Sequence, residues 1–114
     1  MKSIDKQKEN LKHLMMLIDN NPELTIYPMV DSEIVADDGF SWWLAGWGSA
    51  SIEEVWSNDE KIYIRSEDEE QLVEELWEGM ELNGLSDDQL YDLAKEQVNQ
   101  YEWKTVITVK IGKL

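Results

Sequence analysis

Carboxylate side chains dominate one stretch of the sequence, residues 67–92. This stretch holds eleven acidic residues and no lysine or arginine. They are Glu67, Asp68, Glu69, Glu70, Glu74, Glu75, Glu78, Glu81, Asp87, Asp88 and Asp92. Carboxylates at this density pair with lysine and arginine side chains, and they can take the place of phosphates on a basic surface. The stretch therefore predicts a binding surface for a basic protein partner.

Helical spacing would place much of this charge on one face. At 100° per residue, five glutamates fall on a single stripe, opposite an apolar face that contains Leu72, Val73, Leu76 and Met80. The members of this acidic stripe are Glu67, Glu70, Glu74, Glu78 and Glu81. A disordered acidic tail would lack the apolar pattern. We therefore expect two folded amphipathic helices, with Asp87, Asp88 and Asp92 on the second.

The charge density of such a helix pair approaches that of nucleic acid. A helix of about 15 residues is roughly 22 Å long, so eleven charges on two adjacent helices give about one per 2 Å. Duplex DNA carries about one charge per 1.7 Å of its axis. This similarity favours mimicry of DNA, whereas the alternative is a solvated face that only keeps the protein soluble.

A serine in a capping-box pattern marks the predicted start of each of the two acidic helices. Ser66 is followed three residues later by Glu69, and Ser86 by Gln89, which is the capping-box pattern. Gly84 suits the C-terminal cap of the first helix. The sequence thus predicts helices that begin after Ser66 and after Ser86.

Residues for other chemistry are few. The only histidine, His13, lies in a lysine-rich helix, there is no cysteine, and no nucleophile, phosphate-loop or metal-binding motif occurs. The acid pairs 37–38 and 59–60 favour diffuse counterion binding over a dedicated metal site. Two acid-x-lysine triplets, 59–61 and 102–104, are expected by chance in a chain that is 31% charged. We expect no catalytic residue, no cofactor and no metal, and hence a protein that is not an enzyme.

The remaining segments complete an α+β domain. Residues 3–19 predict a helix with Ile4, Leu11, Leu14, Met15 and Ile18 on one face. Residues 25–35 and 40–51 predict a strand hairpin around a turn at 37–39, with Pro28 marking an edge or bulged strand. Residues 61–65 and 103–111 predict further strands, and residues 52–59 are ambiguous. The expected order is α-β-β-β-α-α-β in one domain, residues 1–114, with about four strands, mainly antiparallel and possibly mixed.

Tryptophans offer a second candidate surface. Trp42, Trp43 and Trp47 are concentrated in the predicted hairpin, and one strand face cannot bury all three. Trp77 lies at the border between the apolar face and the acidic stripe, where an aromatic anchor surrounded by charge would suit an interface. The partner could therefore meet either the acidic helices or the tryptophan-rich hairpin.

The net charge of −15 is unevenly distributed. Residues 1–13 and 101–114 each carry +2, which leaves −19 on residues 14–100 (2 + 2 − 19 = −15). Direct binding to nucleic acid or to an anionic membrane is unfavourable for such a body. No apolar run approaches a membrane span, and no signal sequence is evident. We expect a cytoplasmic protein.

Several segments are similar to a known group of proteins. PMVDSEIVADDGFSWWLAGWG, KIYIRSEDEEQL and the terminal VITVKI resemble a family of small acidic proteins encoded by phages and prophages of low-GC Gram-positive bacteria. The resemblance runs from about residue 22 to residue 111. Small acidic phage proteins of this kind include anti-CRISPR proteins, which block the DNA-binding cleft of a guided nuclease. The resemblance thus implies an inhibitor that acts in a bacterial host cell.

Two functions follow as expectations. In the first, the acidic helices block the basic DNA-binding cleft of a host defence protein, with a CRISPR effector nuclease as the implied target. Its interface is expected at Glu67, Glu70, Glu74, Trp77, Glu78, Glu81, Asp87, Asp88 and Asp92. In the alternative, the protein is a phage accessory or assembly module that binds a protein through its tryptophan-rich hairpin.

Overall fold

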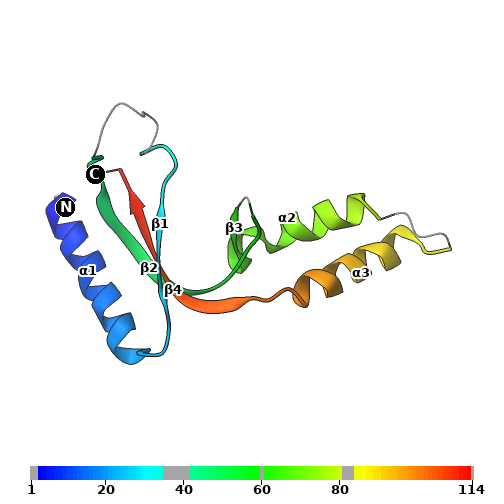
Figure 1. Cartoon of the computed structure of the whole chain (residues 1–114), viewed down its shortest axis with the longest axis horizontal. Coiled ribbons are helices and arrows are strands. Elements are labelled where there is room, and N and C mark those ends of the chain that lie inside the picture. The colour runs from blue at the N-terminus through cyan, green and yellow to red at the C-terminus, as the bar shows by residue number, and fades with distance from the viewer. Residues whose placement is uncertain (1–2, 35–41, 60, 81–83, 114) are drawn as a thin grey trace. The chain divides into compact units, whose positions relative to one another are not determined.

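The computed structural model describes residues 3–34, 42–59, 61–80 and 84–113. Within these ranges the chain forms three helices and a four-stranded mixed sheet, an α+β fold (Figure 1). The elements are α1 (Ser3–Asn20), β1 (Ile26–Val30), β2 (Gly46–Ser57), β3 (Ile62–Ile64), α2 (Arg65–Glu78), α3 (Asp87–Asn99) and β4 (Lys104–Gly112). The predicted fold class and element order are confirmed, and the sheet is mixed rather than mainly antiparallel.

The strands are ordered β1-β4-β2-β3, with β1 parallel to β4 and β2 antiparallel to β3. The predicted hairpin of residues 25–35 with 40–51 is therefore wrong, because β4 lies between β1 and β2. The residues of the last strand suit this inner position, since 106–109 are Val, Ile, Thr and Val and all four are buried, so both faces of the strand are covered. The ambiguous residues 52–57 continue β2, whereas the expected turn at 37–39 lies outside the described residues.

Pro28 occupies a position that only an edge strand allows. The Asp31 N–H donates to the Ile111 carbonyl, so the odd-numbered residues of β1 direct their N–H groups towards β4. An N–H at position 28 would point away from the sheet, and proline has none to leave unsatisfied. The predicted edge strand is confirmed.

The chain divides into two compact units, residues 1–52 with 105–114 and residues 53–104. In the first unit, α1 packs on the sheet through Leu14, Leu17 and Ile18, which lie against Ile107 and neighbouring residues. Ile4 and Met15, predicted on the same face of α1, are instead 52% and 55% exposed. The expectation of a single domain stays a prediction.

In the second unit, α2 and α3 pack against each other, and α2 also contacts β3 (Figure 1). Their shared core consists of Tyr63, Leu72, Val73, Ala94 and Val98. The predicted apolar face of the first acidic helix is thus confirmed. In β3 the structure buries Tyr63 and Ile64 and covers Ile62 only in part. Trp56, which pairs with Tyr63 across β2 and β3, stacks on its ring at 5.5 Å between centroids.

Only one of the two predicted capping boxes forms. Ser86 caps α3 as expected: its hydroxyl accepts from the Gln89 N–H and the Gln89 side chain accepts from the Ser86 N–H. Ser66 does not cap α2, because β3 leads directly into a helix that begins at Arg65 with Ile64 as its N-cap. The C-terminal cap is Gly79 rather than Gly84, whose φ of 88° serves the turn before α3.

Candidate functional site

The acidic stripe lies on the solvent side of α2. Glu67, Glu70, Glu74 and Glu78 are all exposed, whereas Leu72 and Val73 on the opposite side are buried. The structure therefore brings four of the five stripe residues together on one helix. The fifth, Glu81, lies outside the described residues.

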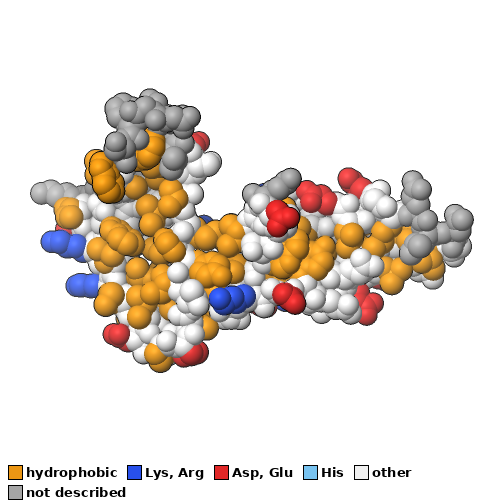
Figure 2. All heavy atoms as spheres, in the orientation of Figure 1, with side chains coloured by type: hydrophobic (Ala, Val, Ile, Leu, Met, Phe, Trp, Pro, Cys, Tyr) orange, Lys and Arg blue, Asp and Glu red, His pale blue; other side chains and the backbone are white. Residues whose placement is uncertain are grey.

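The second helix carries its own exposed acids. Asp87 and Asp88 lie in the first turn of α3, where carboxylates suit the positive end of the helix dipole, and Asp92 follows one turn later. Figure 2 shows acidic side chains along both edges of the second unit, with hydrophobic side chains between them on the face in view. The predicted site is thus two acidic rows rather than one continuous surface.

The spacing of these rows still approaches that of DNA. Glu67 and Glu78 are separated by about 16 Å along the helix axis at 1.5 Å per residue. Within the described part of residues 67–92, eight carboxylates are exposed. They are Glu67, Glu70, Glu74, Glu75, Glu78, Asp87, Asp88 and Asp92. The five on α2 give about one charge per 3 Å, which is close to the roughly 3.4 Å between phosphates along one DNA strand.

Two of the eleven acids act inside the fold instead. The Asp68 carboxylate accepts a hydrogen bond from the Ile64 N–H at 2.8 Å, which satisfies a free donor at the start of α2. Glu69 binds Arg65, one turn earlier on the same helix, with Nε to Oε2 at 3.1 Å. These two carboxylates are half-buried and belong to the helix start rather than to the binding surface.

Arg65 joins four segments of the second unit. Besides Glu69 it contacts Glu54 of β2 at 3.2 Å, and it donates to the Asn99 side chain at the end of α3. Its guanidinium also lies over the Trp103 ring, 5.3 Å from the centroid. Sequence reasoning missed this residue, although the i,i+4 spacing of Arg65 and Glu69 is a recognisable signal.

The neighbours of Arg65 favour the charged form of its side chain. The hydrogen bond to Glu69 raises the pKa of Arg65 above its ordinary value, outweighing the opposite effect of burial, and the negative charges of Glu69 and Glu54 add to it. A raised folded pKa contributes stability at every pH below the ordinary arginine value. Arg65 is therefore a permanent cation at the N-terminal end of the acidic helix.

A shallow hollow of about 420 Å³ lies at this end of α2. It is lined by the carboxylates of Glu67 and Glu70 together with Lys95 and Tyr91 of α3. Arg65 and Lys95 lie just outside the sequence interval 67–92. The folded surface therefore carries more positive charge than that interval suggests. The anionic character strengthens away from this end, towards Glu74 and Glu78.

Trp77 is half-buried between the two helices. Its ring meets Tyr91 edge-to-face at 5.8 Å, and both rings pack against the core of the second unit. The predicted position at the border of the apolar face is what the structure shows. Trp77 thus supports the helix pair and leaves only part of its indole for a partner.

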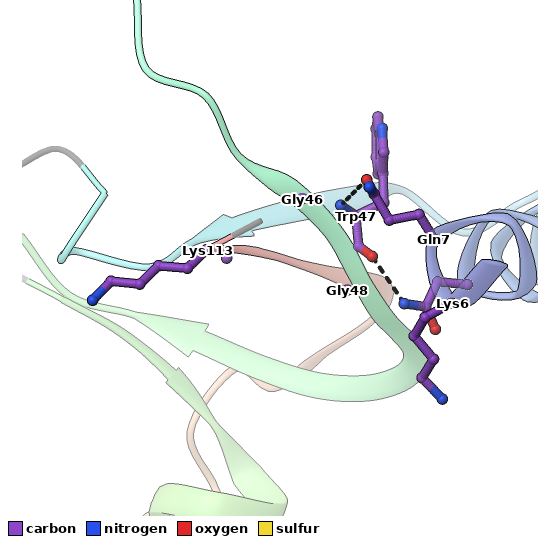
Figure 3. A pocket seen from close by; sticks show the side chains of 8 residues that line it. Lys6, Gln7, Gly46, Trp47, Gly48 and Lys113 are labelled. Carbon is purple, nitrogen blue, oxygen red and sulfur yellow. Dashed lines mark hydrogen bonds between the residues drawn. The ribbon is translucent and has the colours of Figure 1, made fainter. Parts of the chain in front are cut away.

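The tryptophan-rich segment is more exposed than Trp77. Trp42 is 91% exposed and Leu44 80% exposed, both ahead of β2, and Trp47 at the start of β2 is 43% exposed. The Trp47 backbone is held by α1: its N–H donates to Gln7 Oε1 at 3.1 Å and its carbonyl accepts from Asn10 Nδ2 at 2.8 Å (Figure 3). A rigid backbone with exposed aromatic side chains is suited to protein contact.

The hollow beside Trp47 measures about 290 Å³ and includes Lys6 and Lys113 in its lining. Figure 3 shows these two lysine side chains extending away from each other. Lys113 pairs with Glu33 at 3.0 Å. The two cations therefore do not converge on one ligand position.

Other kinds of site receive no support from the described residues. Within them, no three histidine or carboxylate side chains gather as metal ligands would. Asp37, Asp38 and Glu60 lie outside them. No helix in the described ranges combines the length and the apolar character needed to cross a membrane.

Comparisons of the chain with protein-family models, with curated proteins and with solved structures found no match.

Proposed function

We propose that the protein is a non-enzymatic, acidic interaction protein whose α2–α3 surface occupies the basic nucleic-acid-binding cleft of a host defence protein. The observation that supports this is the ordered display of eight exposed carboxylates at a spacing close to that of DNA phosphates. The resemblance to small acidic phage proteins makes a CRISPR effector nuclease the proposed partner. The proposed place of action is the cytoplasm of a bacterial host cell.

The fold favours such binding because the charges are held before the partner arrives. The core of Leu72, Val73, Ala94 and Val98 fixes the two helices, so little backbone order remains to be gained on association. Glu70, Glu74 and Glu78 would take phosphate positions, with the acids of α3 as the second row. The exposed part of Trp77 would supply an apolar contact between the rows.

Competition with DNA tests the proposal. A labelled DNA duplex bound to a guided nuclease should be displaced by the protein at about 50 mM salt and much less at about 200 mM, because charge pairing is screened. The triple variant Glu70→Lys, Glu74→Lys, Glu78→Lys should lose roughly 100-fold in affinity, on the order of 3 kcal/mol.

A matched control has the same change in charge on a different helix. The variant Asp5→Lys, Glu9→Lys, Asp19→Lys alters three exposed acids of α1 and should displace DNA as the native protein does. If both triple variants weaken displacement equally, only net charge matters and the α2 surface is not the site. A protein that displaces no DNA at low salt would overturn the proposal.

A second candidate function has its own observation, the exposure of Trp42 and Leu44. Large apolar side chains this exposed are unfavourable in water and are common at protein interfaces. In this candidate the protein is a phage accessory or assembly module that binds through its tryptophan-rich segment. An affinity pull-down of the partner protein separates the two: Trp42→Ala with Leu44→Ala should abolish partner binding here, and the charge reversals on α2 should not.

A further inference from the structure

Apolar side chains lie exposed in a region of the first unit that the proposed function does not use. On α1 they are Ile4 and Met15, 52% and 55% exposed, and on β1 they are Ile26 and Val30, 41% and 53% exposed. Figure 2 shows hydrophobic side chains spread over the face of this unit in view, with lysines at the outer edge. We name the four residues, with the partly buried Leu11, the α1–β1 shelf.

The two elements of the shelf lie on the same side of the sheet. Ile26 pairs with Ile107 in the parallel β1–β4 register, and paired residues of parallel strands share a face. Ile107 packs against α1, so Ile26 and Val30 face the layer that contains α1. Ile26 and Val30 stay 41% and 53% exposed in this layer, because α1 packs mainly on Ala50, Ile107 and Val109.

The exposed flank of α1 is the flank turned away from β2. At 100° per residue, Ile4, Leu11 and Met15 fall within about 40° of one another and about 100° or more from Asn10. The Asn10 side chain bonds to Trp47 of β2, which fixes the direction of that side of the helix. The shelf is therefore the β1 side of the α1 layer, where a second helix would complete the covering of the sheet.

The dimensions of the shelf match a short helix. Ile4 and Met15 are about 16 Å apart along α1 at 1.5 Å per residue. The five residues of β1 span about 17 Å at 3.3 Å per residue. A helix of three turns, about 11 residues, has this length. Strand addition at β1 is less favourable, because Pro28 removes an outward N–H donor.

Two lysine side chains beside the α1–β1 shelf indicate what kind of helix would bind there. Lys8 and Lys12 are exposed and lie one turn apart on α1, next to Met15 on the helix surface. Within the described ranges neither lysine makes an ion pair. An occupant with carboxylates one turn apart along its flank would pair with both.

We propose that the α1–β1 shelf is a docking site for an amphipathic helix of a partner protein, with an apolar stripe on the shelf and acidic residues against Lys8 and Lys12. A second copy of the chain fits less well, because its own acidic helices α2 and α3 already bury their apolar faces. An anionic membrane fits less well, because recognition of anionic lipid usually takes about four to eight clustered cations and, among the described residues, only Lys8 and Lys12 flank the shelf.

Model peptides on the full chain test the proposal. The probe is a helical peptide of about 14 residues with leucines on one stripe and glutamates one turn apart on one flank. The readout is the NMR shift of the Ile4, Met15, Ile26 and Val30 methyl groups. These signals should move with the glutamate peptide and move far less with the same peptide carrying lysines.

Two sets of variants sharpen the test. Met15→Glu should weaken binding by about tenfold or more, because it places a charge in the apolar contact. Met16→Glu is the matched control: Met16 is 57% exposed on the same helix but about 100° away, and this variant should bind as the native chain does. Lys8→Glu with Lys12→Glu should reverse the preference towards the lysine peptide.

Three results would overturn the proposal. They are methyl signals that stay still at millimolar peptide, a dimer that Met15→Glu converts to a monomer, and co-sedimentation with anionic phosphatidylserine vesicles that Met15→Glu abolishes. The second result would assign the shelf to another copy of the chain and the third to a lipid surface. The triple lysine variant of α2 should retain these methyl shifts, so the outcome is independent of the function proposed above.

Discussion

Ser66 and Ser86 have the same sequence pattern but different contacts. Ser86 satisfies a free N–H at the start of α3, whereas the Ser66 hydroxyl donates to Glu53 Oε2 at 2.8 Å on an exposed surface. The difference arises from what precedes each serine. A loop comes before Ser86, but the buried Tyr63 and Ile64 come before Ser66 and carry the chain from β3 into α2.

Alanine at each serine tests this difference. Ser86→Ala should lower the free energy of unfolding by about 1 kcal/mol, the usual effect of losing an N-cap. Ser66→Ala should cost less than about 0.5 kcal/mol, because an exposed hydrogen bond is largely replaced by water. Urea denaturation followed by circular dichroism measures both. Equal losses would mean that Ser66 does stabilise the start of α2.

Arg65 shows what residue types alone could not predict. The sequence identifies a cation next to an acidic run, but not that Glu69, Glu54 and Asn99 meet around it. Glu54 and Asn99 come from β2 and α3, so their convergence depends on tertiary packing. The exposed acids at i,i+3 and i,i+4 positions were predictable, because helical periodicity alone places them.

Among the elements, β2 and β4 approach each other closely at Gly48. A Cβ atom there would lie 2.6 Å from the Lys110 carbonyl oxygen, which belongs to the backbone of the neighbouring strand. Side-chain rearrangement cannot relieve such a contact, so the strands would have to separate. Gly48 therefore allows the close pairing of β2 and β4.

Alanine at Gly48 should destabilise the fold by about 1–3 kcal/mol, the range found for overpacked sites. Gly112 is the control, because a Cβ atom there meets nothing within 4 Å and Gly112→Ala should be close to neutral. Thermal unfolding of both variants measures the difference. A neutral Gly48→Ala would show that β4 can move away from β2 without cost.

The elements were largely predictable, and their pairing was not. Periodicity located α1, α2, α3 and β4, and Pro28 marked β1 as an edge strand. The pairing of β1 with β4 joins residues far apart in the sequence, and local turn chemistry favoured the wrong hairpin. The exposure of Ile4 and Met15 was not predicted either. Helical periodicity shows how wide the apolar face of α1 is, but not how much of that face the sheet covers.

On the scale of the whole molecule, the net charge of −15 determines how stability responds to salt. Exposed carboxylates on α2 and α3 repel one another, and this repulsion opposes the compact state. Raising sodium chloride from about 20 mM to about 300 mM shortens the screening length severalfold. The melting temperature should therefore rise.

The triple lysine variant of α2 provides the control for this effect. Because Glu70→Lys, Glu74→Lys and Glu78→Lys reduce the repulsion directly, its melting temperature should depend less on salt than that of the native chain. Differential scanning calorimetry at both salt concentrations gives the comparison. An identical salt dependence in the two proteins would show that repulsion on α2 does not limit stability.

The hydrogen bonds between the Gln7 and Asn10 side chains of α1 and the Trp47 backbone have a further consequence. Two side-chain amides on a helix occupy the donor and the acceptor that a neighbouring strand would otherwise use. If α1 detached, the start of β2 would present an unpaired backbone beside exposed indole rings, which is a template for cross-β growth. The N-terminal helix thus covers a backbone edge of the kind that can template cross-β growth.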